Sequence, residues 1–308
     1  MAKSRVFPSR VLICRMALLR KPSEKTLSLA DMLIGCHTSV AKDIRLAPLR
    51  AAKLGCEAMQ IFSRPPQGGK APVISRRLAD DFKRACQQAN IRAVYLHTPY
   101  FINLASPNNR IKYGSVKVIR EELERASLLG AKYVITHLGS ARGHSSKKEA
   151  LREVAQMLIK SLDGYQGKAK LLLENSAGAG EIIGKSLADL SWLLETTSLQ
   201  PIAGICLDTQ HSFASGYDWR QFAQVRRQLS KETKEQNIKL IHLNDSAVAA
   251  GSCRDRHAHL GEGQIDLAAL EQIVCWAKKL NIDLICETKL GGVAADIKKA
   301  KQMRNLCK

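Results

Sequence analysis

Short apolar segments recur along the chain and alternate with longer stretches in which apolar residues follow helical spacing. The stretches SVKVIREELERASLLGA and DLAALEQIVCWAKKL show that helical spacing. Eight of the apolar segments are predicted to be strands: MLIGC (32–36), EAMQIF (57–62), AVYLH (93–97), YVITH (133–137), AKLLLEN (169–175), AGICLD (203–208), IKLIHL (238–243) and IDLICE (282–287).

This alternation predicts a parallel sheet with right-handed crossovers, and eight units in one chain favour closure into a (β/α)8 TIM barrel. We therefore expect one barrel domain over residues 32–308. The alternative is an open, doubly wound sheet. No Gly-x-Gly-x-x-Gly turn follows the first strand, so a dinucleotide site is not supported.

Residue types that bind metals stand at the ends of consecutive predicted strands. From the third strand to the eighth, the strand ends carry His97, His137, Glu174, Asp208, His242 and Glu287. All strand C-termini of a barrel meet at one face, where active sites are built. Buried carboxylates and imidazoles without compensation would be costly there, and a divalent ion is the simplest compensation. The sequence thus predicts a zinc or manganese site at the C-terminal rim.

Three loop residues extend this set beyond the needs of one ion. His211 lies three residues after Asp208, and Asp255 and His257 lie two residues apart, a spacing that points both side chains the same way in an extended segment. Nine candidate ligands fit two or three metal ions. The alternative for Asp208 is a simple helix cap, with His211 left in solvent.

The charge of the chain indicates a polyanionic partner. The 308 residues hold 48 Lys and Arg against 28 Asp and Glu, a net charge of +20. Such an excess suits nucleic acid, because each neutralised phosphate releases counterions. No run approaches the roughly 20 apolar residues of a membrane span. The longest early candidate, VLICRMALL (11–19), is interrupted by Arg15.

The nine cysteines are scattered and form no Cys-x-x-Cys pair. We expect them to be free, mostly buried thiols in a reducing compartment, and hence a cytoplasmic protein. Residues 1–31 carry seven Lys and Arg and two acids without a periodic pattern. We favour a flexible basic extension, or an upstream start codon with the working protein beginning at Met32, over an organellar targeting segment.

The motifs together resemble the endonuclease IV family of apurinic/apyrimidinic endonucleases. The likeness runs from IGCHTS (34–39) to ICETKLGG (285–292), and its motifs are LHTPYFINLASPN, THLGS, LLENSAGAG, LDTQHSFASGYD, HLNDS, DRHAHLGEGQI and CET. Seven matches in family order are specific, whereas one alone would not be.

The resemblance implies a barrel that holds three zinc ions, with Mn²⁺ as an alternative at one or more sites. It places His97 and His137 on the first ion and has Glu174 bridge this ion to a second. The second ion is also held by Asp208, His242 and Glu287, and the third by His211, Asp255 and His257. Glu174 and Glu287 are the expected catalytic residues, because they would position the attacking hydroxide.

The implied reaction is hydrolysis of the phosphodiester 5′ to an abasic site in duplex DNA, as in base excision repair. It leaves a 3′-hydroxyl and a 5′-deoxyribose phosphate. We expect the protein to be a monomer. Tyr100 and Phe101 match the family's wedge that fills the gap left by the missing base; the alternative is that they pack under the rim. In IFSRPPQGGK, Gln67 stands where the family has an arginine that probes the duplex, and Arg64 lies nearby.

Other histidines and two rival functions complete the expectations. His37 is expected to support the site or contact phosphate, while His144 and His259 are not expected to bind metal. Gly261 and Gly263 should allow a tight turn. One rival is a divalent-metal sugar-phosphate isomerase or epimerase on the same barrel. The other is a nucleic-acid-binding protein without catalysis. The loop ligands and the charge of +20 argue against the isomerase, and the complete ligand set argues against lost catalysis.

Overall fold

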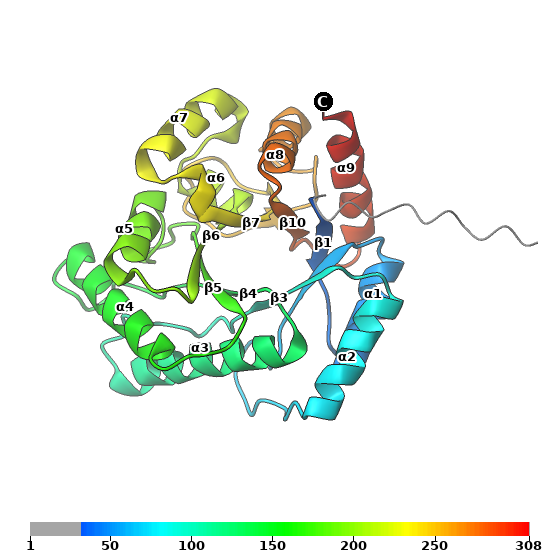
Figure 1. The fold of residues 1–308 in the computed structure, drawn as a ribbon. Coiled ribbons are helices and arrows are strands. Elements are labelled where there is room, and N and C mark those ends of the chain that lie inside the picture. Colours follow the sequence, from blue (N-terminus) through cyan, green and yellow to red (C-terminus); the bar gives the residue numbers. More distant parts are fainter. Residues whose placement is uncertain (1–31, 308) are drawn as a thin grey trace, which may run out of the picture. The chain divides into compact units, whose positions relative to one another are not determined.

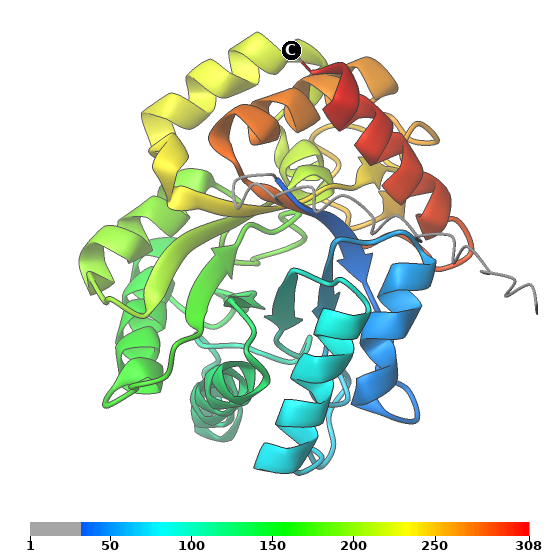
Figure 2. The ribbon, with the colours of Figure 1, turned by 45° about the vertical axis from the view of Figure 1, so that its right-hand side comes forward.

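The eight segments predicted as strands close into one barrel in the computed structural model, which describes residues 32–307. The strands are parallel and adjacent in chain order, and β1 pairs with β2 on one side and with β10 on the other. Figures 1 and 2 show the ring with its helices outside. The strands are β1 (Ile34–His37), β2 (Ala58–Ile61), β3 (Ala93–His97), β4 (Tyr133–Thr136), β5 (Lys170–Glu174), β6 (Ile202–Asp208), β7 (Ile238–His242) and β10 (Asp283–Cys286). The predicted TIM barrel is confirmed. The extension predicted over residues 1–31 lies outside the described residues.

Helices supply the crossovers between successive strands. They are α1 (Ala47–Lys53), α2 (Arg76–Gln88), α3 (Asn109–Leu129), α4 (Lys147–Leu162), α5 (Leu187–Thr197), α6 (Thr209–Ser215), α7 (Phe222–Glu232), α8 (Leu267–Leu280) and α9 (Val293–Leu306). The helices α2 to α5 each begin at a residue whose side chain accepts a hydrogen bond from a backbone N–H of the first turn: Ser75, Asn108, Ser146 and Ser186. Such caps fix where each rim loop ends.

The connection from β7 to β10 contains a small two-stranded sheet that the strand pattern did not predict. Strands β8 (Asp245–Ser246) and β9 (His257–Ala258) pair antiparallel. The buried carboxylate of Asp245 accepts hydrogen bonds from the N–H groups of Gly261, Gly263 and Ile265. A Cβ on Gly263 would lie 2.4 Å from Asp245 Oδ1, and Gly261 has φ +80°. The expected close backbone approach and tight turn are therefore present.

Two layers of side chains fill the inside of the barrel. The lower layer is an apolar cluster to which most strands contribute a residue, among them Ala58, Tyr95, Leu172, Leu240 and Ile285. Side chains two positions apart on a strand point to the same face. The next inward residues on six successive strands are consequently the predicted ligands, in the pairs Tyr95–His97, Ile135–His137, Leu172–Glu174, Cys206–Asp208, Leu240–His242 and Ile285–Glu287.

The prediction that all cysteines are free is wrong for two of them. Cys275 on α8 and Cys307 after α9 form a disulfide across 32 residues of sequence. Their pairing depends on the packing of α8 beside α9, which neither sequence spacing nor a motif reveals. The remaining cysteines of residues 32–307 are free, and five of these six are buried. Within the same residues, no helix is long and apolar enough to cross a membrane.

Candidate metal centre

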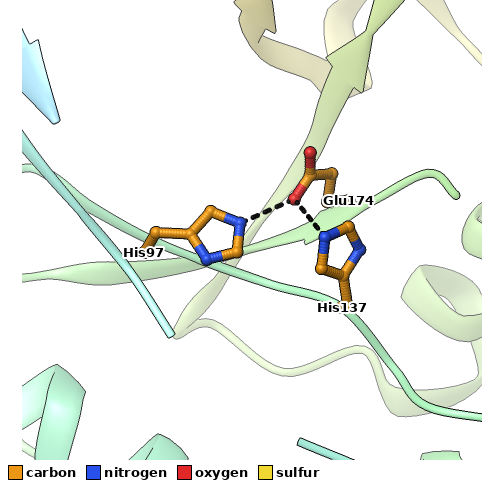
Figure 3. Close-up of side chains that lie close together, drawn as sticks. All are labelled: His97, His137 and Glu174. Carbon is orange, nitrogen blue, oxygen red and sulfur yellow. Dashed lines mark hydrogen bonds and ion pairs between the residues drawn. The ribbon is translucent and has the colours of Figure 1, made fainter. Parts of the chain in front are cut away.

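His97, His137 and Glu174 form the first of three groups with metal-binding potential. They come from the ends of β3, β4 and β5, as Figure 3 shows. The Nε2 atoms of His97 and His137 lie 2.9 and 3.3 Å from the same oxygen, Glu174 Oε2. Glu174 and His97 are buried, whereas His137 is partly open to the pocket above. Two imidazole nitrogens and one carboxylate oxygen therefore face a common point.

Glu174 also belongs to the second group, together with Asp208, His242 and Glu287. Its other oxygen, Oε1, lies 2.9 Å from His242 Nδ1. The same nitrogen lies 3.1 Å from Glu287 Oε2 and 3.9 Å from Asp208 Oδ2. The two carboxylate oxygens of Glu174 thus face two different groups, which is the arrangement of a bridging ligand.

The third group brings the loop residues together. His211 and His257 lie close to Asp208. Asp255 lies between the two histidines, with Oδ2 3.4 Å from His211 Nε2 and Oδ1 3.4 Å from His257 Nε2. Asp208 Oδ2 lies 3.7 Å from His257 Nε2, so Asp208 stands between the second and third groups. All nine residues selected from the sequence thus lie in one continuous cluster.

Backbone carbonyls fix the orientation of three of these imidazoles. His97 Nδ1 lies 2.6 Å from the oxygen of Thr98, and His211 Nδ1 lies 3.0 Å from that of Asn175. His257 Nδ1 faces the oxygen of Glu287 at 3.5 Å. A carbonyl accepts only, so each Nδ1 carries a proton, and Nε2 is the nitrogen that faces the centre and is available to bind an ion. Outer hydrogen bonds of this kind are typical of metal-binding histidines.

The electrostatics of the cluster call for added positive charge. Among residues 32–307, every ion pair of Glu174, Asp208, Asp255 and Glu287 is with a histidine, and no Lys or Arg reaches them. Burial alone would raise the pKa of Glu174, but His137 and His242 hold that pKa well below its usual value. Burial alone would lower the pKa values of His211 and His242, but the neighbouring carboxylates contribute to raising them, so protonated imidazoles balance the ionised carboxylates. A divalent ion can take the place of those protons.

One ring nitrogen of the cluster makes no hydrogen bond within residues 32–307, although carboxylate oxygens lie 3.4 and 3.7 Å from it. His257 Nε2 is buried and makes no hydrogen bond. An unpaired buried polar atom is costly and calls for a missing partner. Together with the mixture of imidazole and carboxylate donors, this atom fits divalent ions such as Zn²⁺. We conclude that the cluster has the composition and the geometry of a multi-metal centre.

Six residues of the cluster line a pocket of about 1030 Å³, namely His97, His137, His211, Asp255, His257 and Glu287. The pocket walls are the loops after β1, β2 and β10, and Tyr100 lies on its edge. Tyr100 is 65% exposed and Phe101 41% exposed, so they do not pack under the rim. Gln67 is also exposed, and its loop contacts theirs through a hydrogen bond from Tyr100 N–H to the oxygen of Pro66.

Arg64 is placed differently from Gln67. Its guanidinium is buried and donates to Glu122 Oε1 at 2.6 Å and to Glu121 Oε2 at 2.8 Å. Arg64 lines the pocket, but its charge is already paired within the protein. This ion pair holds the loop after β2 against α3.

Three supporting residues were missed by the sequence reasoning. Asn244 donates to Asp208 Oδ2 at 2.7 Å and accepts from the N–H of Glu287, and Asn175 accepts from the N–H of Asp208. Gln60 on β2 contacts both His242 and Glu287. The signal for Gln60 was a polar residue two positions after the inward-facing Ala58 in an otherwise apolar strand.

The histidines outside the ligand set have other partners. His37 lines the pocket, and burial lowers its pKa to about 4, so it is neutral. His144 Nε2 donates to the oxygen of Ala105, and His259 Nδ1 lies 2.7 Å from the buried carboxylate of Asp296. Neither His144 nor His259 lies in a metal-binding group of the described chain.

Known proteins resemble this chain over most of its length. The family model described as "Xylose isomerase-like TIM barrel" matches residues 48–306. The probable endonuclease 4 of Methanoculleus marisnigri is 36% identical over 278 residues, which cover 89% of this chain and 99% of that protein. The crystal structure of endonuclease IV from Thermus thermophilus has a TM-score of 0.79 at 29% identity, covering 89% of this chain and 99% of the other.

A structure of a D-tagatose 3-epimerase-like protein is also similar, with a TM-score of 0.67 and 19% identity over 89% of this chain and 98% of the other. At that identity the likeness shows the fold alone. The relatives that match at higher identity are endonucleases, in agreement with the motifs. The chain therefore belongs to the endonuclease IV family of the xylose isomerase-like TIM barrels.

Proposed function

We propose that the protein hydrolyses the phosphodiester 5′ to abasic sites in duplex DNA, leaving a 3′-hydroxyl and a 5′-deoxyribose phosphate. The observation that carries the proposal is the sharing of the buried Glu174 between two groups of metal-binding side chains. Members of both groups, His97, His137 and Glu287, line an open pocket. Membership of the endonuclease IV family supplies the class of reaction and the DNA substrate.

The residues present fit three zinc ions. His97, His137 and Glu174 would hold one ion, and Glu174, Asp208, His242 and Glu287 a second. His211, Asp255 and His257 would hold the third, with Asp208 nearby. When bound, such ions supply a hydroxide at neutral pH and neutralise charge on a phosphoryl group. Mn²⁺ at one or more positions is consistent with the same nitrogen and oxygen donors.

Glu174 and Glu287 are the proposed catalytic residues. Both carboxylates face His242 Nδ1, at 2.9 and 3.1 Å, and both point toward the centre of the cluster. Burial would raise the pKa of Glu287, but His242 lowers it below its usual value. Each carboxylate is thus ionised and can accept a hydrogen bond from an attacking water, which orients that water toward phosphorus.

The rim would recognise the lesion. Tyr100 and Phe101 project from the loop after β3 as exposed apolar side chains beside the pocket. An abasic site leaves a gap in the base stack that such side chains can fill. Gln67 on the adjacent loop would contact the same region of the duplex without adding charge. Arg64 would act by holding this loop, because its guanidinium is already paired with Glu121 and Glu122.

A sugar-phosphate isomerase is the second candidate, favoured only by the shared barrel. A small substrate requires neither the third group of ligands nor a net charge of +20. Metal analysis separates the two, because an isomerase of this kind needs one or two ions per chain and the proposed endonuclease three.

The decisive experiment uses a labelled duplex with one tetrahydrofuran abasic analogue, incubated with the purified protein before and after prolonged chelation. The analogue cannot undergo β-elimination, so the expected product is a single hydrolytic cut on its 5′ side that chelation abolishes and Zn²⁺ restores. Absence of a cut by protein that demonstrably contains metal would refute the proposed reaction and direct attention to sugar phosphates.

A further inference from the structure

Gln60 is a fully buried polar residue on β2, on the inner face of the barrel. Its strand neighbours Ala58, Met59 and Ile61 are also fully buried and apolar. Burying an amide costs free energy unless each of its polar groups is hydrogen-bonded. A glutamine at this position therefore requires specific partners.

The partners of Gln60 are two predicted ligands and one further histidine. The amide nitrogen Nε2 lies 2.6 Å from Glu287 Oε1 and 3.1 Å from His37 Nδ1. The amide oxygen Oε1 lies 2.8 Å from His242 Nε2. The hydrogen-bonding capacity of the amide is thus directed at three side chains of one site.

The chemistry of these partners assigns the orientation of the amide. Glu287 is an ionised carboxylate that can only accept, so the group facing it must be the NH₂. The oxygen of Gln60 then faces His242, and His242 Nε2 must carry a proton to donate to it. With a proton on Nε2, the nitrogen of His242 that remains to bind an ion is Nδ1, the atom that faces Glu174 and Glu287.

We propose that Gln60 is a positioning residue of the metal centre, which sets the tautomer of His242 through its amide oxygen and the orientation of Glu287 through its amide N–H. The second N–H of Gln60 faces His37 Nδ1 and leaves the proton of that neutral ring on Nε2. This inference rests on the proposed metal centre, since the tautomer matters only if Nδ1 of His242 binds an ion.

His242 differs from three other histidines of the cluster in the group that orients its ring. Backbone carbonyls orient His97, His211 and His257, and no substitution removes those carbonyls. His242 instead depends on a side chain, and it faces the cluster through Nδ1. Gln60 is thus a point at which the orientation of His242 can be changed without replacing a predicted ligand.

The test measures which ring nitrogen binds the ion. Protein labelled with ¹⁵N-histidine is loaded with ¹¹³Cd²⁺, whose coupling to ¹⁵N identifies the binding nitrogen directly. The wild-type protein should show coupling to Nδ1 of His242. Gln60→Met preserves the size of the side chain but removes its hydrogen bonds, and it should lose this coupling and bind Cd²⁺ about 10- to 100-fold more weakly, as found for outer groups of other metal sites.

Two further variants separate positioning from stability. Tyr95→Phe removes another buried hydrogen bond inside the barrel, to Asp283 in the layer below, and should lower thermal stability without changing Cd²⁺ binding. Gln60→Glu keeps an acceptor for His242 but loses the donor to Glu287, so it should keep the Nδ1 coupling while binding Cd²⁺ more weakly. Gln60→Glu also tests the role of Gln60 if Gln60→Met does not fold.

The outcomes distinguish the two hypotheses. Wild-type protein that takes up no Cd²⁺ or Zn²⁺ would overturn the proposed metal centre itself. Metal-binding wild type with unchanged affinity and Nδ1 coupling in Gln60→Met would overturn only the role of Gln60. Loss of the Nδ1 coupling in folded Gln60→Glu would overturn the role assigned to the amide oxygen.

Discussion

Asp208 accepts a hydrogen bond from the backbone N–H of His211 at 2.7 Å through Oδ1, while its Oδ2 faces His242 and His257. The carboxylate is therefore both the N-cap of α6 and a member of two metal-binding groups. The sequence left helix cap and metal ligand as alternative roles for Asp208. In the structure one carboxylate oxygen caps the helix and the other faces the metal-binding groups. Because the cap fixes the first turn of α6, it also fixes where His211 enters the site.

Replacing Glu287 with Gln should lower kcat on the tetrahydrofuran duplex by more than about 100-fold. Loss of a group that only supports a ligand costs up to about 100-fold, and Glu287 lies inside the cluster itself. The Kd for uncleaved duplex should stay the same or tighten, since one negative charge near the phosphates is lost. Glu262→Gln, an exposed change in the rim loop after β9, serves as the control. Activity near that of wild type in Glu287→Gln would remove this residue from the catalytic set.

Replacing Tyr100 and Phe101 together with Ala should reduce the preference for abasic over undamaged duplex by about tenfold, since one lost stacking contact costs on the order of 1–3 kcal/mol. The two Kd values from a competition assay give the ratio. Leu306→Ala removes an exposed apolar side chain at the far end of α9 and should leave the ratio unchanged. An unaltered ratio in the double variant would place the wedge elsewhere on the rim.

Gln67→Arg should tighten binding to duplex DNA by about threefold to tenfold and steepen the salt dependence by about one phosphate contact. Gln67 is exposed on the loop next to Tyr100, so the new charge would face the proposed DNA surface. The matched control is Gln88→Arg, at the exposed end of α2. An equal effect of both variants would mean that the gain reflects net charge alone.

Removing the metal ions should lower the thermal unfolding midpoint by about 10 °C. An ion present at about 1,000 times its Kd stabilises the folded state by roughly 4 kcal/mol, and each kcal/mol shifts the midpoint of a large domain by about 2–4 °C. Calorimetry before chelation, after it and after addition of Zn²⁺ gives the shift and its reversal. A midpoint insensitive to chelation in protein proven free of metal would contradict a metal-stabilised barrel.

Glu57→Gln should destabilise the fold at pH 7 by about 1–2 kcal/mol, the range for hydrogen bonds to charged groups. Glu57 accepts from the N–H of Ile34 and from Arg304 on α9. Burial would raise the pKa of Glu57, but Arg304, the N–H of Ile34 and Lys301 together lower it below its usual value.

A lowered folded-state pKa stabilises the protein above the unfolded value of about 4.3 and ceases to do so as the pH falls through the folded value. Urea unfolding should therefore show a difference between wild type and Glu57→Gln at pH 7 that shrinks below about pH 4. Glu124→Gln, which breaks an exposed pair with Arg120, should change stability by less than about 0.5 kcal/mol. A difference that persists undiminished in acid would exclude the charge of Glu57 as its cause.

The strands and their polar ends were predictable because both depend on local pattern. The predicted C-terminal ends of the strands differ from the observed ones by at most one residue, and the residues at those ends converge as the barrel requires. The pairing of Cys275 with Cys307 and the burial of Arg64 against Glu122 depend on contacts between distant helices and loops. The role of Gln60 could not be predicted, because a single amide in an apolar strand carries no charge and belongs to none of the motifs.

Each of the strands β3 to β7 and β10 contributes one inward-facing residue to an apolar lower layer and one to the polar layer above it. Packing of the barrel and the candidate site therefore depend mainly on different residues. The lower layer, with Tyr95, Leu172 and Leu240, packs the strands together, while the residues two positions further on form the candidate metal centre. A lineage could replace the upper layer almost entirely and still inherit a folded barrel. The same fold in an epimerase-like protein of only 19% identity shows that very different sequences form this barrel.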